Sequence, residues 1–159
     1  MERTIINKNM KTMTQTNTPI QSVGINITKK DKADLESMID AILKNGESKD
    51  DYSSLIAELN RATVVDGDLI SRNVVTMNSR VSIIDGDTSE RLIFTLVFPE
   101  DADIATGNIS VLSPIGSAML GYKVGDDIEW AVPGGVRKFT IAKVDYQPEA
   151  IERSKKRKL

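Results

Sequence analysis

The segment SPIGSAMLGYKVGDDIEWAVPGG, residues 113–135, carries the local signals that decide the fold of the second half of the chain. Ser113 is a preferred helix N-cap, Pro114 suits the first helical position and Gly121 suits a helix end, so the segment predicts one short helix. The alternating letters DIEWAV then predict a strand, and PGG at residues 133–135 predicts a tight turn. A short helix followed by a strand and a turn indicates a sheet with a helix packed on one face.

Strand and turn signals continue on both sides of this segment. RVSII and RLIFTLVF flank DGDTSE, in which Asp85-Gly86 is a strong hairpin turn signal. PEDADIATGN, residues 99–108, is interpreted as a loop, ISVL as a short strand and VRKFTIAKVDY as the closing strand. Over residues 74–150 we therefore expect an α+β domain: a twisted antiparallel sheet of about five strands, mostly joined by hairpins, with one short helix.

Upstream of the sheet, two apolar stripes predict a short antiparallel helical hairpin, in the manner of a coiled coil, over residues 27–66. The letters TKKD at residues 28–31 form a capping box, and Asn45-Gly46 suits the end of the first helix. At ~1.5 Å per residue, a first helix over residues 28–44 is about 25 Å long. The stripes consist of Leu35, Met38, Ile39, Ile42 and Leu43 in the first helix and Leu55, Ile56, Leu59 and Ala62 in the second.

The remaining segments are polar or charged. Residues 1–26 are rich in Thr, Asn and Gln and lack periodicity, so we expect a mostly disordered tail there, and residues 64–73 are interpreted as a linker. Five basic side chains lie within RSKKRKL, residues 153–159, whereas the rest of the chain carries 16 basic and 23 acidic groups, a net charge of −7. We expect this basic tail, residues 151–159, to be a solvated, disordered end that could make a weak contact with nucleic acid.

The composition excludes several classes of chemistry. The 159 residues include neither cysteine nor histidine, which excludes disulfides, thiol catalysis, Ser-His-Asp triads and ordinary zinc sites. The N-terminal letters lack the apolar region of a signal peptide, and no apolar run approaches the length of a membrane span. We therefore expect a cytoplasmic protein without membrane contact. A monomer is the default expectation, although the sequence leaves self-association open.

The letters of residues 113–135 also follow a longer pattern, S-P-I-G-x-A-x-L-G-x-x-V-G-D and then P-G-G. This pattern resembles the C-terminal domain of the bacterial Gre transcript-cleavage factors. VVTMNSRV at residues 74–81 and YQPEA at residues 146–150 are similar to the regulators of nucleoside diphosphate kinase, a short-armed family within the Gre superfamily. The resemblance covers roughly residues 27–150 and implies a helical hairpin followed by an FKBP-like C-terminal domain.

The resemblance implies a non-enzymatic transcription regulator without a metal or cofactor of its own. Members of the superfamily dock on RNA polymerase at the rim of its secondary channel, on a coiled coil of the largest catalytic subunit. Gre factors commonly carry Asp where this chain has Leu112, which changes the polar detail of the contact. The alternative is that Ser113 and Pro114 only begin a helix. Both residues can begin the helix and bind a partner at the same time. The polymerase-binding residues implied by the resemblance are Leu112, Ser113, Pro114, Ile115 and Gly116.

KNGESKDDY, residues 44–52, joins the two predicted helices and suggests a second function. Acids at the tip of a Gre arm help to hold a second Mg²⁺ in the polymerase active site, and Glu47 and Asp50 match those positions. This alternative makes the chain a transcript-cleavage elongation factor. However, each helix is about 15 residues shorter than in a Gre factor, which removes about 22 Å of reach at ~1.5 Å per residue. We therefore expect a regulator that competes with Gre factors without stimulating cleavage. The acids are then expected only to stabilise the first turn of the second helix, which Ser48 caps.

A third function follows from the FKBP-like fold, which also suggests peptidyl-prolyl isomerase activity. Fold alone does not imply that activity, and an isomerase pocket needs an aromatic lining. Trp130 is interpreted as a half-buried strand position, with a partner contact as the alternative. The other aromatic residues of the sheet domain are scattered in the sequence: Phe94, Phe98, Tyr122, Phe139 and Tyr146.

Overall fold

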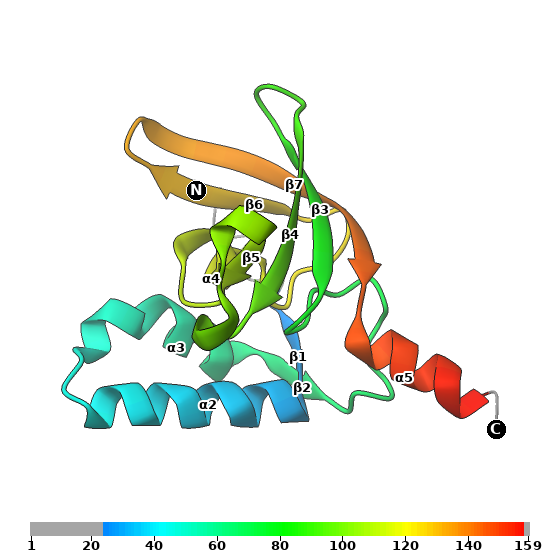
Figure 1. The fold of residues 1–159 in the computed structure, drawn as a ribbon, viewed down its shortest axis with the longest axis horizontal. Coiled ribbons are helices and arrows are strands. Elements are labelled where there is room, and N and C mark those ends of the chain that lie inside the picture. Colours follow the sequence, from blue (N-terminus) through cyan, green and yellow to red (C-terminus); the bar gives the residue numbers. More distant parts are fainter. Residues whose placement is uncertain (1–23, 158–159) are drawn as a thin grey trace, which may run out of the picture.

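The computed structural model describes residues 24–157, so the expected tail over residues 1–23 lies outside the described residues. The expected boundary at residue 26 is wrong, because Ile25 is buried in the core and Asn26 begins strand β1. Within the described range, no helix is long and apolar enough to cross a membrane. The described chain forms one mixed α+β structure (Figure 1).

A curled sheet of five strands in the order β5-β4-β3-β7-β6 forms the centre of the molecule (Figure 1). Its neighbouring strands are antiparallel except for β4 and β5, which are parallel, so the expectation of an entirely antiparallel sheet is wrong. The cause is the segment after β4. It contains two short 3-10 helices, η2 and η3, which carry the chain back along the sheet, so that β5 begins in the same direction as β4. The elements are β3 (Arg80–Asp85), β4 (Arg91–Val97), η2 (Pro99–Asp101), η3 (Ile104–Thr106), β5 (Asn108–Ser110), β6 (Asp127–Val132) and β7 (Gly135–Tyr146).

Helix α4 (Pro114–Met119) packs against β5 and β6 and confirms the short helix predicted from its cap residues. Ile115 and Met119 on α4 are buried, and Gly121 after the helix adopts a positive φ of 83°. The aliphatic core that α4 covers contains buried side chains from β3, β4 and β7, including Val81, Ile83, Leu96 and Ile141.

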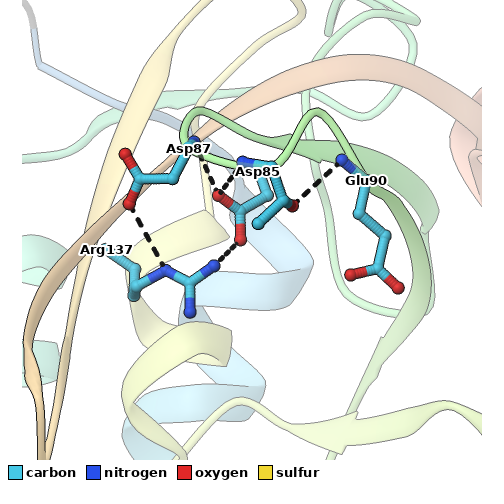
Figure 2. A network of polar contacts seen from close by, with 5 residues as sticks. Asp85, Asp87, Glu90 and Arg137 are labelled. Carbon is cyan, nitrogen blue, oxygen red and sulfur yellow. Dashed lines mark hydrogen bonds and ion pairs between the residues drawn. The ribbon is translucent and has the colours of Figure 1, made fainter.

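The predicted hairpin turn at Asp85-Gly86 joins β3 to β4, and a buried carboxylate organises it (Figure 2). Asp85 accepts hydrogen bonds from the backbone N–H groups of Asp87 (2.8 Å) and Thr88 (3.3 Å). Its second oxygen accepts a hydrogen bond from the guanidinium of Arg137 on β7. The turn is therefore tied both to itself and to the neighbouring strand.

The two predicted helices are present as α2 (Lys29–Lys44) and α3 (Ser53–Arg61), joined through the 3-10 helix η1 (Lys49–Tyr52). Thr28 caps α2 as predicted, because its hydroxyl accepts a hydrogen bond from the N–H of Asp31 at 3.0 Å. Ser48 caps η1 rather than α3, since its hydroxyl accepts from the N–H of Asp50. The second helix therefore begins later than expected and is only 9 residues long.

A two-stranded parallel ladder at the base of these helices was not predicted. Strand β1 (Asn26–Thr28) precedes α2, strand β2 (Thr63–Val65) follows α3, and Asn26 is paired with Thr63. Residues 64 and 65 fall within the predicted linker but belong to β2, because a strand of three residues is too short to show a period of two in the sequence.

Residues 151–157 of the basic tail are helical and not a disordered end, and residues 158–159 lie outside the described residues. Residues Pro148–Arg157 form helix α5, which follows β7 after Gln147. Its acidic residue Glu149 lies in the first turn, and basic residues occupy the last turn, as the helix dipole favours. Figure 1 shows α5 at the end of the molecule opposite the turn between α2 and α3.

Candidate docking surface

The loop that enters α4 is held by hydrogen bonds within the loop itself. The hydroxyl of Ser113 donates to the carbonyl of Ser110 (2.6 Å) and accepts from the N–H of Gly116 (3.1 Å). The hydroxyl of Ser110 accepts from the N–H of Leu112 at 2.9 Å. Ser113 therefore positions the loop, and its hydroxyl already has a donor and an acceptor partner.

The five residues predicted to bind a partner differ in their exposure. Pro114 is exposed, Leu112 and Ser113 are partly buried, and Ile115 and Gly116 are buried. A Cβ added to Gly116 would lie 2.0 Å from the carbonyl oxygen of Ser110, so only glycine fits there. The structure brings the five residues together, but only Leu112, Ser113 and Pro114 offer surface to a partner.

An apolar groove of about 280 Å³ lies beside Pro114. Ile104 on η3 is one of its walls and is 74% exposed, so its side chain adds apolar surface at the edge of the groove. Asp103 lies beside it, and its carboxylate accepts a hydrogen bond from the N–H of Ala105 at 3.1 Å, which fixes the η3 turn. The large apolar side chains in its lining include Phe94, Ile104, Pro114 and Trp130.

Three of these groove residues, Phe94, Ile104 and Trp130, come from separate parts of the chain. Trp130 is partly buried, as predicted, and its ring packs at 5.7 Å from the ring of Phe139. Ile104 was missed because the loop around it was interpreted only as a connection. One signal was present in the sequence: a single large aliphatic residue in the polar loop PEDADIATGN.

The acidic turn between α2 and α3 is held by a hydrogen bond within the turn. The carboxylate of Glu47 accepts a hydrogen bond from the hydroxyl of Tyr52 at 2.8 Å, which raises the pKa of Tyr52. Glu47 and Asp50 are both exposed. Among residues 24–157, no three acidic side chains are grouped so that they could hold a metal ion.

Comparisons with known protein families match the sheet part of the chain. The family described as "Transcription elongation factor, GreA/GreB, C-term" matches residues 70–146. The regulator of nucleoside diphosphate kinase from Escherichia coli K12 is 41% identical over 98 residues, which cover 61% of this chain and 72% of that protein. The transcription elongation factor GreA of Beijerinckia indica is 36% identical over 90 residues, and the match covers 57% of each protein.

A solved structure is similar over most of the described chain. It is titled as a prokaryotic transcription elongation factor GreA/GreB from Nitrosomonas europaea, and it superimposes with a TM-score of 0.66 at 41% identity. The match covers 77% of this chain and 99% of that one. The match to this structure therefore covers a larger share of the chain than the residues 70–146 matched by the family model.

Proposed function

Because the chain belongs to the family of the regulator of nucleoside diphosphate kinase, within the Gre superfamily, we propose that it regulates transcription by binding RNA polymerase. It acts as a binding protein and not as an enzyme. In this proposal it docks at the rim of the secondary channel, on the coiled coil of the largest catalytic subunit. The observation that carries the proposal is the apolar groove beside Pro114, in the part of the chain that matches the GreA/GreB family.

The proposal gives each half of the molecule a role. The sheet and α4 form an FKBP-like docking domain, and α2 and α3 form a short helical hairpin that corresponds to a Gre arm. Such a domain offers Leu112, Ser113 and Pro114 as the polar and apolar rim of the contact. Ile115 and Gly116 keep that rim in place from below, since both are buried.

The groove is suited to apolar side chains of a partner helix. Its exposed wall Ile104 and its aromatic residues Phe94 and Trp130 would lose water contact on binding, which is favourable at about 25 cal/mol per Å² of apolar surface. Large apolar and aromatic side chains at the centre of an interface are the usual carriers of binding energy. The groove therefore supplies the affinity, and the loop at Ser113 supplies its orientation.

Docking without RNA cleavage follows from the length of the arm. Helix α2 has 16 residues, which gives about 24 Å at ~1.5 Å per residue. A tip that does not reach the catalytic Mg²⁺ cannot contribute ligands to it, because carboxylates bind metal only by direct contact. In this proposal the protein occupies the channel entrance and competes with Gre factors. The alternative, a cleavage factor that uses Glu47 and Asp50, is not favoured.

Ile104→Ser tests the docking surface. We expect about tenfold weaker binding to core RNA polymerase, because the variant removes an apolar contact at the groove. The free protein should keep its Tm, since Ile104 is exposed before binding. The measurement is the dissociation constant by biolayer interferometry, with thermal unfolding as the check on folding.

Leu69→Ser is the matched control, because Leu69 is 76% exposed but lies outside the groove. It should bind polymerase like the unaltered protein. Equal binding by both variants and the unaltered protein would remove the groove from the proposal. Absence of any complex between the unaltered protein and core polymerase would end the proposal itself.

A weak contact between nucleic acid and the basic tail stays a prediction. Arg153 and Lys156 bond to other parts of the protein, so Lys155 and Arg157 are the better candidates. A contact of this kind should weaken steeply with salt, because bound counterions are released from the phosphates. Filter binding of RNA at increasing salt, with and without the Lys155→Ala and Arg157→Ala changes, measures it.

A further inference from the structure

Helix α5 begins beyond the end of the segment that matches the GreA/GreB family, yet it bonds to residues far away in the chain. The guanidinium of Arg153 donates a hydrogen bond to the carbonyl of Gly67 at 2.7 Å. The ammonium of Lys156 lies 3.0 Å from the carboxylate of Asp68. Both partners belong to residues 66–68, which follow β2 and connect the two helices to the sheet.

The same connecting residues are also held from the other side. The ammonium of Lys29, the first residue of α2, lies 2.9 Å from the carboxylate of Asp66. Residues 66–68 therefore lie between α2 and α5, with an ion pair to each helix. The connection therefore has one charged contact with α2 and one with α5.

The start of α5 is hydrogen-bonded to the segment that precedes β3. The amide Nε2 of Gln147 donates to the carbonyls of Ser71 and Val74, each at 2.8 Å, and Gln147 is buried. The hydroxyl of Thr76 donates to the carboxylate of Glu149 at 2.7 Å. One end of α5 is thus anchored near the sheet, while its last turns contact the connection to α2 and α3.

A second contact links the segment before β3 to α2. The N–H of Met77, next to Thr76, donates to the carboxylate of Asp31 on α2 at 3.0 Å. Asp31 is 5% exposed, so this contact is buried. Residues 76 and 77 therefore contact α5 and α2 at adjacent positions, which makes one continuous contact from the C-terminal helix to the first helix of the arm.

We propose that α5 is a brace that sets the orientation of the two-helix segment, residues 29–61, relative to the sheet. The cations at positions 153 and 156 are three residues apart and lie on one face of the helix, as spacing of this kind requires. That face contacts the protein's own connecting residues. This geometry favours an internal brace over a nucleic-acid contact as the role of Arg153 and Lys156.

The brace is built from contacts that can open. The Lys156–Asp68 pair is 63% and 66% exposed, and the Lys29–Asp66 pair is 68% and 55% exposed, so each is individually weak. Their combined effect is to narrow the range of orientations, while a partner that contacts residues 66–68 can release them. The inference concerns the free protein and does not depend on the proposed polymerase partner.

Distance measurements between two spin labels test the brace. The chain contains no cysteine, so Lys44→Cys at the end of α2 and Lys138→Cys on β7 create two unique labelling sites, both exposed. We expect a narrow distance distribution by pulsed electron paramagnetic resonance in the full chain. The pair Arg153→Ala and Lys156→Ala should broaden this distribution or shift its centre, with little change in Tm.

The pair Lys155→Ala and Arg157→Ala is the matched control. It removes the same charge from the same helix, and within residues 24–157 neither side chain bonds to residues 66–68. This control should keep the narrow distribution. An unchanged distribution in Arg153→Ala/Lys156→Ala, or equal broadening in both pairs, would overturn the brace.

A charge exchange gives a second readout. Lys156→Asp alone should broaden the distribution, because it places two acids beside each other, and Asp68→Lys added to it should narrow the distribution again. Failure of the exchange to restore the distribution, together with an unchanged Arg153→Ala/Lys156→Ala pair, shows that α5 does not orient the helices.

Discussion

At the scale of single residues, Asp31 is a buried acid whose pKa is raised. Its carboxylate is buried at the joint between α2 and the sheet, and burial raises its pKa to about 6, against the effect of the hydrogen bond from the N–H of Met77. The neighbouring acids Glu149 and Asp34 raise the pKa further, and Lys30 lowers it. The ionised carboxylate therefore costs stability at neutral pH.

Asp31→Asn should stabilise the protein at pH 7. In the folded chain Asp31 holds its proton more tightly than in the unfolded chain, so stability falls as pH rises from about 4 to about 6. A shift of about two pKa units is worth about 3 kcal/mol, offset by about 1 kcal/mol for the weaker hydrogen bond from Met77, which leaves a gain of about 2 kcal/mol. Thermal unfolding from pH 4 to pH 8 measures it.

The pH window distinguishes this effect from a general surface effect. The difference in Tm between Asp31→Asn and the unaltered protein should be small near pH 4 and reach its full size above pH 6. Asp34→Asn is the control, since Asp34 is only partly buried and pairs with Lys30, and it should change stability by less than about 0.5 kcal/mol. A difference that is constant over the whole range contradicts the explanation.

The sequence predicted residues with local roles and missed those with distant partners. Thr28 and Ser113 form cap hydrogen bonds within four residues of their own positions, and the positive φ of Gly121 follows from the helix end before it, so cap and turn preferences are sufficient to predict these features. Asp31 was expected only as part of the capping box. Its contact with Met77 spans 46 positions and depends on how α2 packs on the sheet, which no local preference records.

At the scale of elements, the β3–β4 hairpin depends on one carboxylate. The N–H of Asp87 above all, then the N–H of Thr88 and the guanidinium of Arg137, hold the pKa of Asp85 below its ordinary value (Figure 2). A lowered pKa means that the carboxylate contributes stability above about pH 4 and loses that contribution as pH falls below it. The hairpin should therefore be the acid-sensitive element of the sheet.

Asp85→Asn tests this dependence. We expect a lower Tm at pH 7, because the variant loses the ion pair with Arg137 and one strong acceptor for the turn amides. The loss should shrink toward pH 3, where the unaltered carboxylate is also protonated. Amide hydrogen exchange at residues 87 and 88 should become faster in the variant at neutral pH.

Asp87→Asn is the control for the hairpin. The side chain of Asp87 is 75% exposed and lies 3.7 Å from Nε of Arg137, so its loss should have little effect. Equal destabilisation by both changes would assign the effect to net charge and not to the turn.

Elements were predictable where they were long or had a clear turn signal. The helix α2, the β3–β4 hairpin and α4 were expected from stripes, Asp85-Gly86 and Ser113-Pro114. The parallel pairing of β5 with β4 and the ladder of β1 with β2 were not, because three-residue strands take their direction from tertiary packing. Helix α5 was missed because its charge indicated disorder, whereas its contacts with residues 67 and 68 support the helix.

At the scale of the whole molecule, the docking groove and the acidic turn lie in different parts of the structure. The groove is next to α4, and the turn is at the far end of α2 (Figure 1). The loop at Ser113 was predictable, since the resemblance marks it. The groove was not, because η3, β4 and β6 contribute Ile104, Phe94 and Trp130 from separate segments that only the folded sheet brings together.

A transcript-cleavage assay with backtracked polymerase tests the proposed mechanism. The protein alone should not shorten the RNA, and added to a Gre factor it should slow cleavage in proportion to its concentration. Glu47→Ala combined with Asp50→Ala should behave like the unaltered protein, because the proposed mechanism keeps these acids out of contact with the metal. Ile104→Ser should lose the competition.

The opposite result has a clear meaning. RNA shortening by the unaltered protein that disappears in the Glu47→Ala/Asp50→Ala variant would establish the cleavage factor in place of the competitor. Persistent competition by Ile104→Ser, with the protein bound to polymerase, would place the docking contact elsewhere on the molecule.

The parallel ladder of β1 and β2 allows the length of the two-helix segment to change independently of the way the segment is attached. Both ends of the two-helix segment are held in this ladder, and the ladder is joined to the segment that follows α4, where the N–H of Asn26 donates to the carbonyl of Gly121. Equal insertions into α2 and α3 would move only the turn between these two helices, and would leave the ladder and the sheet unchanged. The length of the two-helix segment can therefore change during evolution without any change in how the segment is attached to the rest of the molecule.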